Sequence, residues 1–162
     1  MPLNPTRNDL SKPTREKIVK LLNARLADAV DLQTQCKQAH WNVKGPSFIS
    51  LHELFDKVYD AVEEATDLIA ERAVQLGGTA AGTARAAAKA STLKEYPHDL
   101  TDGADHVAAL ADRLAAFGAA VRHAIEEATK LEDADTADVF TEISREADKQ
   151  LWFVEAHAQG RS

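Results

Sequence analysis

Apolar residues recur along this chain at alternating intervals of three and four, with polar residues filling the positions between them. That spacing places the apolar side chains on one face of an α-helix, and it continues over four long stretches. The pattern predicts helices over residues 11 or 14 to 42, 47–76, 103–130 and 134–158. Either Ser11 or Thr14 suits the start of the first helix, because a side-chain oxygen there can accept a backbone N–H.

The lengths of the connections predict how these helices are arranged. Short loops join the first helix to the second and the third to the fourth, so each pair should be antiparallel neighbours. Residues 77–102 separate the second helix from the third, and this stretch is long enough to run the length of a bundle. Its Ala-rich run 84–90 favours a short extra helix. We therefore predict an all-α, ferritin-like four-helix bundle with one long crossover.

Composition adds limits to this picture. The 162 residues suffice for one domain with a core, which we place at residues 11–158 between short tails at 1–10 and 159–162. No apolar run approaches the roughly 20 residues of a membrane span, and the start lacks the apolar core of a signal peptide. Cys36 is the only cysteine, which excludes an internal disulfide. We expect a cytoplasmic protein with no membrane partner.

Five side chains able to bind metal stand out near the end of the first helix and along the second. They are separated by 12, 4, 11 and 4 positions, and they are His40, His52, Asp56, Asp67 and Glu71. The two steps of four each place a pair on one face of a helix. Neutral imidazole and carboxylate together suit ferrous iron, with zinc or manganese as possible competitors.

The same spacing bears on how many chains form one centre. His52 and Glu71 lie about 28 Å apart along a straight helix, at 1.5 Å per residue. One helix therefore cannot bring both pairs to one metal. If all five side chains serve one centre, a second copy must supply half of it. A two-fold contact between antiparallel copies of the second helix does this, and it generates two identical sites.

Four motifs that contain or flank these residues resemble those of the Dps family, the DNA-protection-during-starvation mini-ferritins. They are KQAHWNVKG at 37–45, LHELFD at 51–56, DLIAERAVQLGG at 67–78 and LWFVEAH at 151–157. The resemblance covers about residues 6–158, and the spacing of the five candidate ligands is the family's. It implies a hollow homododecamer of four-helix subunits, with the short extra helix at the two-fold interface.

The resemblance also implies a function. Ferrous iron would bind at ferroxidase centres between subunits, be oxidised preferentially by hydrogen peroxide, and be stored inside as ferric mineral. Each centre would combine His40, His52 and Asp56 of one subunit with Asp67 and Glu71 of its neighbour. Ordinary ferritins and rubrerythrins instead use Glu-x-x-His pairs inside one bundle. The second helix has no such pair, so we do not expect a di-iron centre within one subunit.

Further acidic residues are candidates for handling iron outside the centre. Four of them cluster at the start of the last predicted helix: Asp133, Asp135, Asp138 and Glu142. The resemblance implies that this region lines three-fold pores through which iron passes, although acidic residues favour helix N-termini in any case. Glu53, beside His52, is a candidate for nucleating the mineral, by the same resemblance.

Three residues near His40 have two open interpretations each. Lys37 either pairs with a carboxylate of the centre or is solvated. Trp41 is either a core or interface residue or, as the resemblance suggests, an interceptor of stray oxidising equivalents. Cys36 is either a redox group near the centre or a small buried residue of the first helix.

DNA binding is the alternative function. Family members that bind DNA often carry a mobile tail rich in Lys and Arg, whereas Arg7 is the only basic residue before the first helix and Arg161 the only one in the C-terminal tail. Lys12 and Arg15 could contribute to a local basic patch. The chain's formal charge is −7, so twelve copies would carry −84. We expect weak or absent DNA binding, and nucleoid association only if DNA is bound. A shell that binds metal passively is a third possibility.

Overall fold

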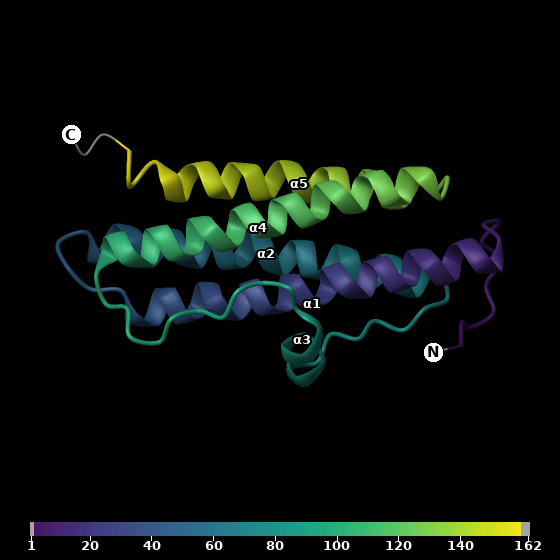
Figure 1. Cartoon of the computed structure of the whole chain (residues 1–162), viewed down its shortest axis with the longest axis horizontal. Helices are drawn as coiled ribbons and strands as arrows, with labels where there is room; N and C mark the ends of the chain where they lie inside the picture. The colour runs from purple at the N-terminus through teal and green to yellow at the C-terminus, as the bar shows by residue number, and fades with distance from the viewer. Residues whose placement is uncertain (1, 160–162) are drawn as a thin grey trace.

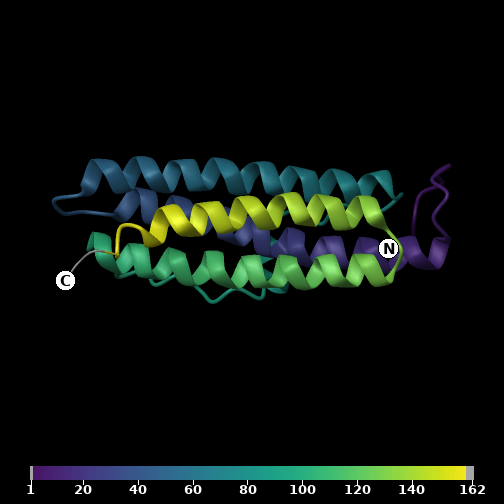
Figure 2. The same ribbon diagram turned by 90° about the horizontal axis from the view of Figure 1, so that it is seen from above.

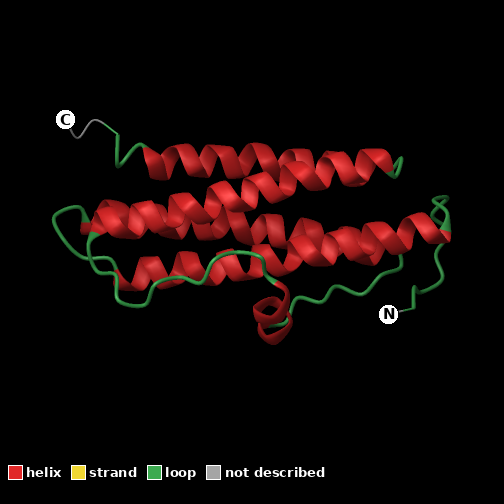
Figure 3. Ribbon diagram, in the orientation of Figure 1, coloured by secondary structure: helices red, strands yellow, loops and turns green. Residues whose placement is uncertain are grey.

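The protein is described by a computed structural model covering residues 2–159, and within that range helices and loops make up the fold, with one isolated β-bridge between Lys44 and Asp102 (Figures 1 and 3). The helices are α1 (Lys12–Asn42), α2 (Phe48–Gln75), α3 (Ala84–Ala90), α4 (Gly103–Lys130) and α5 (Ala134–Glu155). The predicted all-α class, the long crossover and its short helix are confirmed. None of the helices in the described range has the length and apolarity of a transmembrane segment.

The four long helices lie side by side as two antiparallel pairs. The most extensive contacts join α1 to α2 and α4 to α5, as the short connections predicted. Figure 2 shows the four helices running along one common axis, and Figure 1 shows the crossover passing along the outside of the bundle with α3 against α1. All the long helices therefore have one face toward a shared interior.

Local chemistry sets the helix ends. Ser11 caps α1, because its Oγ accepts the N–H of Thr14 at 3.2 Å. Gly45, with φ of 107°, turns the chain between α1 and α2, and Gly77, with φ of 82°, turns it after α2. Glycine adopts such angles without strain. The last helix ends at Glu155, so the predicted end at residue 158 was wrong by part of a turn.

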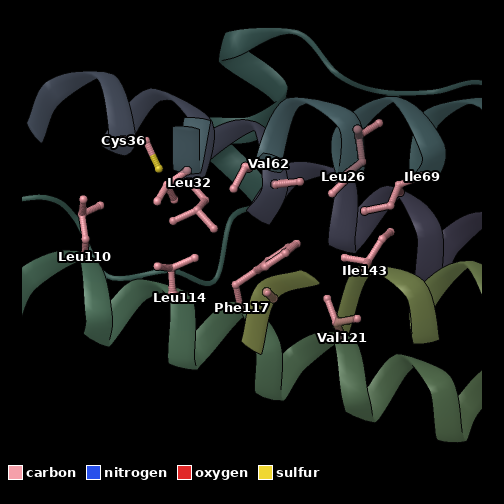
Figure 4. Packing of buried hydrophobic residues seen from close by; sticks show 14 of the residues in the cluster. Leu26, Leu32, Cys36, Val62, Ile69, Leu110, Leu114, Phe117, Val121 and Ile143 are labelled. Atoms are coloured by element: carbon pink, nitrogen blue, oxygen red, sulfur yellow. The ribbon is translucent and has the colours of Figure 1, made fainter. Parts of the chain in front are cut away.

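The interior is a continuous apolar cluster built from all four long helices. Figure 4 shows side chains from opposite helices pointing toward one another across it. Phe55 of α2, Phe117 of α4 and Phe140 of α5 are among its largest fully buried side chains. Burying one such side chain contributes about 1.5–3 kcal/mol relative to leaving it exposed. This cluster holds the two helix pairs together and gives the candidate site a rigid support.

Buried polar contacts dock the crossover onto the bundle. Asp28 of α1 is fully buried and accepts hydrogen bonds from both the backbone N–H and the hydroxyl of Thr92, at 2.7 and 3.0 Å. Arg25 neutralises the same carboxylate at 2.7 Å. Farther along, Arg113 of α4 donates to the carbonyl of Glu95 at 2.7 Å. Each of these buried charged groups has a polar partner, which offsets part of the cost of burying it.

Candidate metal centre

The end of α1 and the start of α2 bring two histidines into face-to-face contact. The rings of His40 and His52 are stacked, with centroids 3.6 Å apart and planes 20° from parallel. Each ring bonds to the backbone of the other residue. His40 Nδ1 lies 2.7 Å from the carbonyl oxygen of His52, and His52 Nδ1 lies 2.8 Å from the carbonyl oxygen of His40. This reciprocal contact also closes the loop between the two helices.

The reciprocal contact decides which ring nitrogens are able to bind metal. A carbonyl oxygen can only accept a hydrogen bond, so Nδ1 must carry the proton in both rings. In a neutral imidazole the other nitrogen, Nε2, then keeps its lone pair. Fixing the tautomer and the ring orientation through a backbone carbonyl is the usual arrangement behind a metal-binding histidine. In both His40 and His52, Nε2 is therefore the ring nitrogen that does not bond to the backbone of the other residue.

Asp56 lies one helical turn beyond His52 and adds a carboxylate to the same region. Its Oδ1 is 3.9 Å from His40 Nδ1. Lys37 of α1 forms an ion pair with this oxygen, and its ammonium also lies 4.3 Å from the centre of the Tyr59 ring. The hydrogen bond from Lys37 lowers the pKa of Asp56 below its usual value and raises the pKa of Lys37. The pairing interpretation of Lys37 is therefore the one the structure bears out.

Asp67 and Glu71 lie toward the other end of α2, away from this group. Both are exposed. Asp67 borders a groove of about 810 Å³ between α1, α2 and the start of the crossover, and Glu71 borders an adjoining hollow of about 400 Å³. Across residues 2–159, no three His, Cys, Asp or Glu side chains converge closely enough to hold a metal ion. One chain therefore presents the five candidates as two separate groups.

The four acidic candidates at the start of α5 differ in their surroundings. Asp135, Asp138 and Glu142 are exposed, whereas Asp133 is buried. Asp133 caps α5 and accepts a hydrogen bond from Arg72 at 2.8 Å. Arg72, which follows Glu71, was not singled out from the sequence. No sequence signal connects it with Asp133, because their contact spans 61 positions.

The other candidates near the two histidines differ in how exposed they are. Glu53 is exposed beside His52. Trp41 is 69% exposed in the single chain, so it is not a core residue, and the interface and interceptor interpretations both stay predictions. Cys36 is fully buried, and burial raises the pKa of its thiol to about 12, which favours the interpretation as a packing residue over a redox group.

The basic candidates for DNA contact lie near the N-terminus. Arg7 and Lys12 are exposed. Arg15 is half-buried and donates to the carbonyl of Leu76 at 3.0 Å. Arg161 lies outside the described residues. The basic patch is therefore smaller than the sequence alone allowed, because one of its members is bonded within the chain.

Comparison with known proteins decides the family. A model of the ferritin-like domain matches residues 19–161. The DNA protection during starvation protein of Agrobacterium fabrum is 44% identical over the whole of both chains. The chain belongs to the Dps family. Among solved Dps structures, the tetragonal form of Mycobacterium smegmatis Dps has 31% identity and a TM-score of 0.90, covering 99% of this chain and 95% of that one. DpsC of Streptomyces coelicolor has 28% identity and a TM-score of 0.93, covering 99% and 94%.

Proposed function

We propose that this Dps protein oxidises ferrous iron, with hydrogen peroxide as the preferred oxidant, and stores the ferric product inside a shell of its own copies. The observation that carries the proposal is the division of the candidate ligands along α2. His52 and Asp56 lie at its start, with His40 of α1 stacked on His52, whereas Asp67 and Glu71 lie toward its other end beside adjoining hollows. Each half is an incomplete metal site on its own.

A second copy completes both halves. When two α2 helices pack antiparallel about a two-fold axis, His52 and Asp56 of one face Asp67 and Glu71 of the other. The groove beside Asp67 has room for groups of the neighbouring chain. Twelve such subunits would enclose a cavity for the mineral, as the family resemblance implies.

The chemistry requires two irons in one centre. A single ferrous ion reduces peroxide by one electron and releases a hydroxyl radical. Two ferrous ions with one peroxide and two protons instead give two ferric ions and two waters. Neutral Nε2 atoms of His40 and His52 suit ferrous iron, while the carboxylates of Asp56 and Glu71 stabilise the ferric charge. Because Lys37 pairs with one carboxylate oxygen of Asp56, iron would compete with its ammonium for that oxygen.

Uptake and storage would use the other acidic residues. Asp135, Asp138 and Glu142 are exposed at the start of α5 and would attract ferrous ions to a pore. Asp133 would attract ferrous ions less than these three residues do, because its charge is already neutralised by Arg72. Glu53 would hold ferric ions while the mineral forms. Zinc and manganese would compete for the same ligands.

DNA binding would be weak. The N-terminal segment is fastened to the bundle, since the N–H of Asn4 donates to the carbonyl of Gly77 at 2.7 Å and Arg15 holds the carbonyl of Leu76. A segment that is bonded to the bundle and carries few basic side chains can make few contacts with DNA phosphates. The chain's formal charge of −7 also repels them. Protection of DNA would then follow from the removal of iron and peroxide.

The test is stopped-flow absorbance after anaerobic loading with ferrous iron. We expect rapid ferric formation with one peroxide consumed per two irons, and a much slower reaction with oxygen. His52→Ala with Asp56→Ala should abolish the fast phase. The matched control, His123→Ala with Asp112→Ala, removes the same residue types from exposed positions on α4 and should keep it. Oxidation no faster than in protein-free buffer would overturn the proposal.

A further inference from the structure

The ion pair between Lys37 and Asp56 is one end of a longer series of polar contacts. The Lys37 ammonium also lies 4.3 Å from the centre of the Tyr59 ring. The hydroxyl of this ring donates to the carboxylate of Glu63 at 3.1 Å, and Gln33 donates to the same oxygen at 3.3 Å. Asp56 and Glu63 therefore lie at the two ends of one series of contacts, with the Tyr59 ring between them.

The order of these contacts follows from helix spacing. Asp56, Tyr59 and Glu63 are separated by three and four positions, so they lie along one face of α2. Gln33 and Lys37 are four positions apart on α1, which packs against α2 in the antiparallel direction. Along this contact, Lys37 has one carboxylate toward the loop between the helices and another in the direction of Gln33.

The carboxylate of Glu63 is able to accept a cation. Its two contacts come from an amide and a phenol, which are neutral groups and leave its negative charge in place. Both contacts use Oε1, so Oε2 takes part in neither of them. Glu63 is exposed and borders the groove of about 810 Å³ beside Asp67. Because an ionised carboxylate accepts at both oxygens, Glu63 can bind an ammonium while it keeps both contacts.

A divalent ion at Asp56 would force Lys37 to change its partner. The ion takes the carboxylate oxygen, and it repels the ammonium because like charges a few Å apart repel each other. The side chains of Lys37 and Asp56 are 26% and 44% exposed, so packing does not lock either of them. The Tyr59 ring attracts the ammonium to its face, and its hydroxyl end contacts Glu63. The ring thus offers the displaced ammonium a path to a second carboxylate.

We propose that Glu63 is a positioning residue that receives the Lys37 ammonium when a divalent ion binds Asp56, and that the Tyr59 ring holds the ammonium on the way. The inference rests on the proposed function, which supplies the ion at Asp56. No covalent bond forms or breaks, since Lys37 exchanges one ion pair for another. The exchange lowers the cost of freeing Asp56 for iron, because the ammonium would otherwise be released to water without a partner.

Asp60 is the competing destination for the ammonium. It lies one turn beyond Asp56 on α2 and is also exposed. Glu63 is favoured because two hydrogen bonds hold its carboxylate, and one of them comes from the ring that the ammonium already contacts. Replacing each carboxylate in turn by its amide separates the two destinations.

The test is a double-mutant cycle on zinc affinity, measured by titration calorimetry on the assembled protein. Zinc binds imidazole and carboxylate and is not oxidised. We expect Glu63→Gln to weaken zinc binding by about two- to fivefold, which is the size of a partly exposed ion pair. In the Lys37→Met background the same substitution should have little effect, because no ammonium needs a new partner. Asp60→Asn is the matched control and should have the same effect in both backgrounds.

Two outcomes of the cycle would overturn the proposal. In the first, Glu63→Gln has the same effect with and without Lys37. In the second, the dependence on Lys37 is found at Asp60 instead. Tyr59→Phe keeps the ring and should keep the coupling between Lys37 and Glu63, whereas Tyr59→Leu should reduce it. Equal coupling in these two variants would exclude the ring from the path.

The crystal structure of the zinc-loaded protein tests the position of the ammonium directly. We expect Lys37 Nζ within about 4 Å of a carboxylate oxygen of Glu63, and no longer paired with Asp56. A Lys37 side chain that stays on Asp56, or that extends into solvent, would contradict the transfer.

The variant His52→Ala with Asp56→Ala separates this inference from the proposed function. If the variant loses zinc binding and the cycle shows no coupling between Lys37 and Glu63, the inference fails alone. If the variant binds zinc as the wild type does, the ion does not bind at Asp56, and the proposed function and the inference fail together.

Discussion

At the scale of single residues, the main feature is the contact in which His40 and His52 each bond to the carbonyl of the other. Spacing and resemblance predicted both histidines as ligands. They could not predict the carbonyl contacts, because these depend on how the loop around Gly45 folds back. Lys37 is similar: the sequence left its partner open, and only the packing of α1 on α2 pairs it with Asp56. Residue types were predictable, and orientations were not.

Removing the Lys37 ammonium should strengthen ferrous binding. In Lys37→Met, iron no longer competes with a cation for Asp56, and we expect a gain of about fivefold or less, since partly exposed ion pairs contribute about 1 kcal/mol at most. Because the hydrogen bond from Lys37 lowers the pKa of Asp56, its loss should also shift the acid limit of iron binding to higher pH. Anaerobic titration calorimetry measures both effects. Lys57→Met, an exposed lysine on α2, is the control, and weaker binding in Lys37→Met would contradict this account.

Cys36 should be unreactive in the folded protein. The thiolate is the reactive form, and a pKa of about 12 leaves almost none of it at pH 8. Alkylation by iodoacetamide, followed by mass spectrometry, should be negligible under native conditions and complete in denaturant. Rapid native labelling at pH 8 would show that Cys36 is accessible and would restore the interpretation as a redox group.

At the scale of helices, α3 and α4 begin and end where the sequence predicted, and the side chains of Thr83 and Asp102 cap their N-termini. The docking of the crossover was not predictable. Asp28 reaches Thr92 over 64 positions, and no local pattern connects them. The same holds for Arg72 and Asp133, which fasten the end of α2 to the start of α5. The spacing of apolar residues therefore predicted the helices, but it could not predict the buried polar contacts between segments far apart in the sequence.

Breaking the contact between Arg72 and Asp133 should destabilise the subunit. Arg72→Met leaves the buried Asp133 carboxylate without its cation and with only the two hydrogen bonds from Thr136, which costs about 3–5 kcal/mol. Thermal unfolding followed by circular dichroism should show a clearly lower Tm. The control, Arg85→Met, removes an exposed arginine of α3 and should leave Tm nearly unchanged. Equal Tm values for the two variants would show that the ion pair contributes little.

At the scale of the whole molecule, the bundle followed from four amphipathic stretches and the lengths of three connections. Membership of the Dps family was predicted from four sequence motifs and from the spacing of the five candidate ligands. The division of the candidate ligands between the two ends of α2 follows from helix geometry, so it was visible in the sequence. The shell itself does not follow from one chain, because its formation depends on surfaces that only neighbouring copies complete.

Charge at this scale predicts little attraction to DNA. With a formal charge of −7 on each chain, we expect no gel shift of linear DNA at about 150 mM salt without divalent ions. Lowering the salt should restore only weak binding. A tight complex at the higher salt would favour the alternative in which condensing DNA is the main role and iron binding is secondary.

The central claim, that each iron centre is shared between two chains, is tested most directly by mixing two inactive variants. One carries His52→Ala with Asp56→Ala, and the other carries Asp67→Ala with Glu71→Ala. Each alone should lose rapid iron oxidation. When the two are co-expressed, half of the two-fold pairs are mixed, and each mixed pair holds one intact centre of two.

The account predicts that the co-assembled protein regains about one quarter of the wild-type fast phase in stopped-flow measurements. The same two variants, folded separately and then mixed, should remain inactive. A co-assembled protein as inactive as its components, or one variant that keeps full activity alone, would contradict the shared centre.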